Sequence, residues 1–122
     1  MTAAPTIQAV ERMQVAPESG AAFERAVVRL FIPAELVYFA GHFQGCPLLP
    51  GVVQLKWAIE LGRAHLPIAG EFCGVSALKF MRVIQPAQAI ELELEVRPAG
   101  RLRFEYRRDG DVCASGVALF QA

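Results

Sequence analysis

The sequence predicts an α+β domain in which one long helix accompanies about five or six antiparallel strands. Residues 51–66 repeat apolar side chains at helical spacing, whereas residues 90–96 alternate strictly between apolar and acidic side chains. Farther on, Asp109-Gly110 separates two strand-like runs. The chain contains no repeat, linker or low-complexity segment, so we expect a single domain over residues 1–122.

Before the helix, two stretches have strand character. Residues 7–15 alternate loosely between apolar and polar side chains and end at the turn signal of residues 17–20. Residues 23–32 read as a strand, which Pro33 closes.

The helix is expected to begin at Pro50 and Gly51 and to end at residues 67–70, where proline and glycine recur. Apolar side chains cover nearly its whole circumference, and a helix of this kind is normally buried.

The rest of the chain reads as strands. Residues 72–84 form one long run that Gln85-Pro86 closes, and the alternating strand of residues 90–96 follows. Residues 101–108 and 112–120 are expected to form a hairpin with a type I′ turn.

Composition excludes several classes of protein. The 12 basic residues balance the 12 acidic ones, whereas a nucleic-acid binder usually has a basic excess. The sequence shows no secretory signal and no apolar run long enough to span a membrane, so a cytoplasmic protein is expected. The cysteines at 46, 73 and 113 have unrelated spacings and predict neither a disulfide framework nor a metal site.

Residues 38–53 carry the strongest functional signal. They place His42 in a loop rich in glycine and proline that leads directly into the helix at Gly51. A helix start presents free backbone N–H groups and the positive end of the helix dipole. The segment can therefore set a base beside donors for an anionic or polarised oxygen. Cys46 lies close to His42 in sequence, but cysteine often serves as a small apolar loop residue.

This loop, with Gly41-His42-Phe43, Pro47 and Leu49-Pro50-Gly51-Val52, resembles the signature of the bacterial β-hydroxyacyl-acyl-carrier-protein dehydratases. Residues 77–82 resemble the Lys-Phe-x-Arg strand of the same family, and the run of residues 51–58 looks closest to its aryl-polyene-type branch. The resemblance covers nearly the whole chain. It implies the hotdog fold, an antiparallel sheet wrapped around one long central helix.

The resemblance also implies a reaction, the removal of water from a 3-hydroxyacyl thioester to give the trans-2-enoyl thioester. The substrate hangs from the phosphopantetheine arm of an acyl carrier protein, and two identical subunits pair. His42 matches the histidine that takes the α-proton, and Gly51 matches the residue whose N–H holds the thioester carbonyl. No metal or redox cofactor is expected, because the thioester already acidifies the proton.

Lys56 departs from the family pattern, since it stands where the family carries the Glu or Asp that handles the departing hydroxyl. Glu60 lies one helical turn farther on, on the same face. One interpretation is a rearranged catalytic pair in which Lys56 or Glu60 acts as the acid. The alternative is a surface pair of little energetic weight.

Further assignments follow from position in the motif. The predicted lining of an acyl tunnel is Phe39, Phe43, Leu49, Val53 and Trp57, although aromatic and aliphatic residues at such spacings are more often core. Lys79 and Arg82 are the predicted contacts to an acidic carrier protein. A hotdog thioesterase and a non-catalytic acyl-binding partner subunit stay open as alternative functions.

Overall fold

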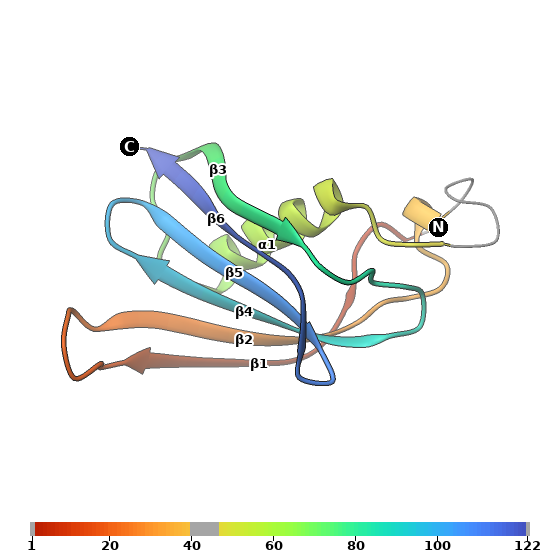
Figure 1. Cartoon of the computed structure of the whole chain (residues 1–122), viewed down its shortest axis with the longest axis horizontal. Coiled ribbons are helices and arrows are strands. Elements are labelled where there is room, and N and C mark those ends of the chain that lie inside the picture. The colour runs from red at the N-terminus through yellow and green to blue at the C-terminus, as the bar shows by residue number, and fades with distance from the viewer. Residues whose placement is uncertain (1, 40–46, 122) are drawn as a thin grey trace.

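A computed structural model describes residues 2–39 and 47–121. Its elements are β1 (Thr6–Val15), β2 (Phe23–Phe31), the 3-10 turn η1 (Val37–Phe39), α1 (Gly51–His65), β3 (Glu71–Phe80), β4 (Ala89–Arg97), β5 (Arg101–Arg108) and β6 (Asp111–Gln121). The strands form one sheet in the order β1-β2-β4-β5-β6-β3, and all of its pairings are antiparallel. The helix crosses one face of this sheet (Figure 1), as the α+β prediction requires.

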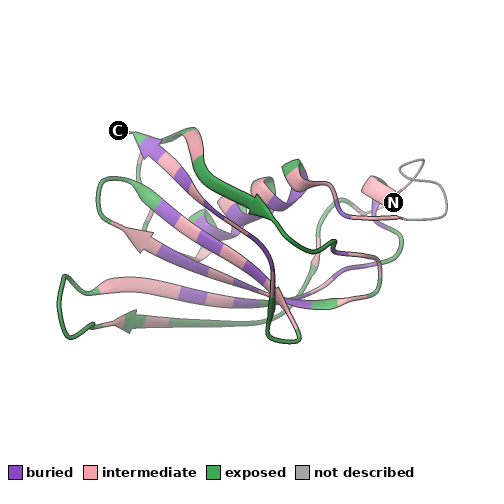
Figure 2. Ribbon diagram, viewed as in Figure 1, coloured by how far each residue is buried: buried purple, intermediate pink, exposed green. Residues whose placement is uncertain are grey.

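The strict alternation predicted for residues 90–96 is confirmed in β4. Leu92 and Leu94 are fully buried on the face that meets the helix, while Glu91 and Glu93 point to the other face with intermediate exposure. Period-two alternation places successive side chains on opposite faces of a sheet. The buried positions of β4, β5 and β6 therefore form one continuous apolar layer under α1 (Figure 2).

The β5–β6 hairpin also agrees with the sequence. Asp109 and Gly110 have φ angles of 52° and 82°. A type I′ turn needs positive φ at both central residues, and its twist matches that of the flanking strands.

The helix begins and ends close to the predicted positions but is buried on one side only. Within the chain, Val53, Gln54, Trp57, Ala58, Leu61 and Gly62 are buried. By contrast Val52 is 74% exposed, and Lys56 and Glu60 are exposed along the same stripe of the helix. The expectation of burial all round is therefore wrong for the single chain, because the sheet covers only one face. None of the described helices is long and apolar enough to cross a membrane.

The predicted strand of residues 72–84 is too long, because β3 ends at Phe80. The amides of Met81 and Arg82 both donate to the Cys113 carbonyl oxygen, at 2.8 and 3.0 Å, so the chain turns away there from the β3–β6 ladder. Ile84 then accepts a 2.7 Å hydrogen bond from the amide of Leu49. The last residues of the apolar run thus pair with the segment that enters α1, a long-range contact that no local pattern encodes.

On the face of the sheet away from α1, Glu95 is only 1% exposed and is surrounded by guanidinium groups, an arrangement we call the Glu95 cluster. Its carboxylate lies 2.6 Å from Arg25, 2.8 Å from Arg97 and 3.4 Å from Arg103. Burial raises the pKa of Glu95, but the hydrogen bonds and charges of Arg97 and Arg25 outweigh this effect and hold the pKa below its usual value.

Glu95→Gln should lower the free energy of unfolding by about 1–3 kcal/mol at neutral pH, because it removes the buried carboxylate that three guanidinium groups share. Since the pKa of Glu95 is depressed in the folded state, its stabilisation is present above the unfolded pKa and is lost as the pH falls through the folded pKa. Denaturant unfolding at several pH values should show wild type and variant converging in acid.

Glu91→Gln is the matched control, since Glu91 makes only a 3.7 Å pair with Arg29 and both side chains are well exposed. Its effect should stay within about 0.5 kcal/mol. Equal losses for the two variants would contradict the special role of the Glu95 cluster.

Candidate functional site

The start of α1 is an uncapped helix terminus. Pro50 occupies the N-cap position with extended backbone angles and provides no side-chain hydrogen bond to the helix. The amides of Val53 and Gln54 donate to the Pro50 carbonyl oxygen, at 3.1 and 3.2 Å. The N–H groups of Gly51 and Val52 precede these bonds and have no intrahelical acceptor. They are therefore donors at the positive end of the helix dipole.

A cavity of about 280 Å³ adjoins these amides, and we call it the helix-start cavity. Two segments wall it, one leading into α1 and the other leading out of β3. Its lining consists of Leu48, Leu49, Gly51, Gln54, Phe80, Met81, Arg82 and Val83. Most of these side chains are apolar, so polar groups of a ligand held here would interact with the few donors and acceptors the cavity offers.

Glycine at position 51 permits a close approach. A Cβ atom at this position would lie 2.5 Å from Cζ of Phe80, whose ring covers the beginning of the helix. The residue that resemblance assigns to carbonyl binding thus also packs closely against Phe80, and the two roles are compatible.

Gln54 is the uncharged polar member of the cavity lining, and sequence reasoning missed it. Its side chain donates from Nε2 to the Leu49 carbonyl oxygen at 3.1 Å. Its backbone carbonyl accepts a 2.6 Å hydrogen bond from the buried hydroxyl of Tyr106, and burial raises the pKa of that tyrosine above its ordinary value. A polar residue within an otherwise buried helix face was the available signal.

The other predicted site residues fall into three groups. His42 and Phe43 lie outside the described residues, as does Cys46, so their roles stay predictions. Gly51 and Leu49 line the helix-start cavity. The remaining tunnel candidates contact the core between helix and sheet: Val53 and Trp57 are 6% and 2% exposed, and Phe39 is half-buried.

Lys56 and Glu60 do not reach the helix-start cavity of their own chain. Both are exposed on the helix face away from the sheet, and no ion pair joins them among the pairs found in residues 2–39 and 47–121. Any action of this pair on a substrate must therefore involve a site other than that cavity.

The two predicted carrier contacts are separated. Arg82 lines the helix-start cavity and lies 4.0 Å from Asp111, with about half of its side chain exposed. Lys79 lies instead beside Arg103 in a shallow hollow of about 120 Å³. Only Arg82 is thus placed at the mouth of the candidate site.

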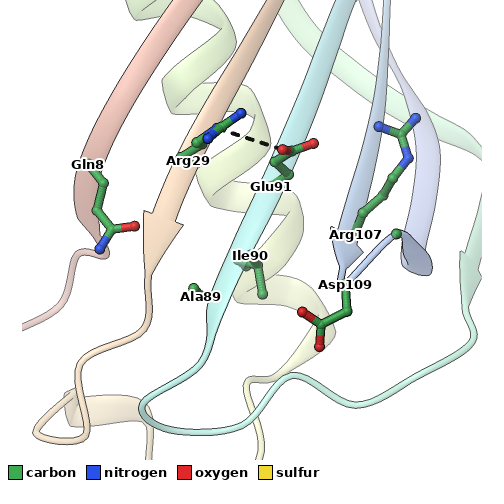
Figure 3. A pocket seen from close by; sticks show the side chains of 8 residues that line it. Gln8, Arg29, Ala89, Ile90, Glu91, Arg107 and Asp109 are labelled. Carbon is green, nitrogen blue, oxygen red and sulfur yellow. Dashed lines mark ion pairs between the residues drawn. The ribbon is translucent and has the colours of Figure 1, made fainter.

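A larger hollow, of about 440 Å³, lies on the sheet face away from the helix (Figure 3). Its two basic side chains are already engaged. Arg29 faces Glu91 across 3.7 Å, and Arg107 contacts Glu93 at 3.0 Å. This hollow lacks free helix amides, and the described part of the chain contains no cluster of metal-ligating side chains. The helix-start cavity is accordingly the better candidate.

Comparison with known proteins identifies the family. Residues 18–117 match the ApeI-like family, described as ApeI dehydratase. Among named relatives, the FabZ 3-hydroxyacyl-[acyl-carrier-protein] dehydratase of Moorella thermoacetica is 32% identical over 79% of this chain and 75% of its own length. The FabZ of Chloroflexus aggregans is 35% identical over 59% of this chain, and the match spans 55% of that relative's length.

Solved structures agree. An uncharacterized protein from Erwinia carotovora superposes with a TM-score of 0.82 at 25% identity, covering 97% of this chain and 96% of the other. A chain of the dehydratase heterocomplex ApeI:P from Xenorhabdus doucetiae superposes with a TM-score of 0.75 at 26% identity, covering 92% and 99%. The hotdog fold is thereby confirmed. The chain belongs to the ApeI-like dehydratase family.

Proposed function

We propose that this protein is a 3-hydroxyacyl-thioester dehydratase acting on a substrate carried by an acyl carrier protein, in fatty-acid or polyene lipid synthesis. The observation that carries the proposal is the uncapped start of α1 at Gly51, which opens into an apolar cavity. The names of the FabZ relatives support the substrate class.

In the proposed reaction the thioester carbonyl accepts a hydrogen bond from the Gly51 N–H, which stabilises the negative charge that develops on that oxygen. His42 takes a proton from C2 as the C–H bond breaks. The C3–O bond then breaks, and the departing hydroxyl leaves as water after it receives a proton. No metal or redox cofactor is needed, because no electrons are transferred and the thioester acidifies C2.

In this proposal, Arg82 contacts the carrier protein or its phosphopantetheine arm. A guanidinium at the cavity mouth suits the phosphate of a phosphopantetheine arm or an acidic carrier surface. The apolar cavity lining then surrounds the reacting part of the substrate.

A homodimer is the second part of the proposal. The edge strand β3 and the residues after it expose Phe72, Leu78, Phe80, Met81 and Val83, each at least 39% exposed. An open edge with apolar side chains is a surface that natural proteins usually cover. A second copy paired along β3 would cover it and would bring another subunit beside the helix-start cavity.

Purified protein should interconvert 3-hydroxyacyl- and 2-enoyl-carrier thioesters, and His42→Ala should lower kcat at least about 100-fold, because general base catalysis is lost. Chromatography of the acyl products measures this. His65→Ala is the control, since His65 lies at the end of α1, away from the cavity. Release of free thiol without enoyl formation would instead establish a thioesterase.

Leu78→Lys should weaken the dimer at least about tenfold, because it sets a charge into the proposed apolar interface. Sedimentation equilibrium measures the change. Val10→Lys is the matched control on the opposite edge strand β1, where Val10 is 37% exposed against 39% for Leu78. A wild-type protein that is monomeric by itself would contradict the homodimer and point to a different partner chain, in line with the ApeI:P heterocomplex from Xenorhabdus doucetiae.

For the departing hydroxyl, we propose that Lys56 or Glu60 of one subunit serves the site of the other. Lys56→Met and Glu60→Gln, made separately, should include one variant with turnover reduced at least about tenfold. Hydration of a 2-enoyl thioester reports this. If both variants keep full turnover while His42→Ala abolishes it, the exposed pair has no part in the chemistry.

A further inference from the structure

Gln54 is a buried carboxamide in the lining of the helix-start cavity. It is 3% exposed and is one of two polar or charged side chains, with Glu95, that are buried in the described part of the chain. Glu95 has three guanidinium partners, whereas half of the Gln54 amide has none. This difference indicates that the unpaired half of the Gln54 amide is matched by a group outside the described part of the chain.

The orientation of the amide is fixed by its neighbour. Nε2 donates to the carbonyl oxygen of Leu49, which can only accept. Leu49 is itself held by its 2.7 Å hydrogen bond to Ile84 and is 2% exposed. Turning the amide over would set two oxygens against each other. Oε1 therefore faces away from Leu49.

Oε1 has no hydrogen-bond partner within residues 2–39 and 47–121. A buried acceptor left unpaired is costly, so such groups are rarely retained without a use. The tyrosine hydroxyl on the Gln54 backbone carbonyl also fixes this part of the helix, so the side chain cannot find a partner through movement of α1. The structure thus holds a rigid acceptor ready for a donor.

Gln54 lies one turn beyond Gly51, roughly 4.5 Å along the helix axis. Both residues line the same cavity. The mostly apolar lining therefore contains one residue with a free donor, the Gly51 N–H, and one residue with an unpaired, buried acceptor, Gln54 Oε1. A fitting ligand has an acceptor and a donor at a short, fixed separation.

We infer that Gln54 is a specificity-determining residue that accepts the hydrogen of the substrate's 3-hydroxyl group while Gly51 holds the carbonyl. This inference rests on the proposed function. A 3-hydroxyacyl thioester bears its hydroxyl on the second carbon from the carbonyl carbon, so it presents an acceptor and a donor a short, fixed distance apart. The 2-enoyl product and saturated acyl chains lack this donor and leave Oε1 unpaired, so the contact favours the hydroxylated substrate and the release of product.

The test uses two unreactive ligands, pantetheine-linked acyl amides of equal chain length, one with a 3-hydroxyl group and one without. Calorimetry gives the dissociation constant of each. Wild type should bind the hydroxylated ligand more tightly by about fivefold, as one neutral hydrogen bond allows. In Gln54→Met, which keeps the volume and removes the acceptor, the ratio should fall to about one. Gln88→Met is the matched control, because the Gln88 amide already accepts from Gln85 and Arg108 and Gln88 is not among the cavity's lining residues.

A fivefold ratio that survives Gln54→Met would overturn the inference. An equal loss of affinity for both ligands would also overturn it. A structural role of Gln54, or a contact to the pantetheine amides, changes both dissociation constants by the same factor. If Gln54→Met does not fold, Gln54→Asn withdraws the acceptor by one methylene and should likewise lower the ratio. Wild type that binds neither ligand and turns over no thioester contradicts the proposed function itself, whereas turnover with an insensitive ratio contradicts only the role of Gln54.

Discussion

The beginning of α1 is held in place by three buried hydrogen bonds, and the candidate site depends on them. Leu49 donates to Ile84, Gln54 donates to Leu49, and Tyr106 donates to the Gln54 carbonyl. Together they join the segment before the helix, the segment after β3 and the middle of the sheet. Buried hydrogen bonds of this kind fix geometry because breaking one leaves an unpaired polar group in an apolar surround. The helix amides are thereby held beside the cavity before any ligand binds.

The two faces of the sheet have different structural roles. Toward α1, the apolar residues of β4, β5 and β6 form the core against which the helix packs (Figure 2). On the other face, the Glu95 cluster and its neighbouring ion pairs connect β2, β4 and β5. In the hollow on this face, Arg29 already pairs with Glu91 (Figure 3). The unpaired donors and the unpaired acceptor of the candidate site lie on the helix side.

Periodic patterns made much of the fold predictable. The alternation in β4, the Asp109-Gly110 turn and the bounds of α1 depend on neighbouring residues, so sequence alone indicates them. The end of β3 depends on Ile84 meeting Leu49, a contact between distant segments. Within the site, Gly51 was found through its motif, whereas Gln54 was missed, because one polar residue in a helix gives no periodic signal. The exposed stripe of α1 was foreseen only as the surface-pair alternative for Lys56 and Glu60, since apolar spacing does not tell which face a sheet covers.

The exposed stripe of α1 forms a solvent-facing side of the helix, opposite the side that packs on the sheet. Val52, an apolar residue at 74% exposure, shares it with Lys56 and Glu60. Because the buried face of α1 supplies Gly51 and Gln54 to the chain's own cavity, the charged stripe is directed elsewhere. If two copies pair along β3, each helix has one face for its own site and another available to its neighbour. A site shared in this way would allow the acid group to change from the family's carboxylate to Lys56 or Glu60 without disturbing the buried hydrogen bonds that hold the carbonyl donor.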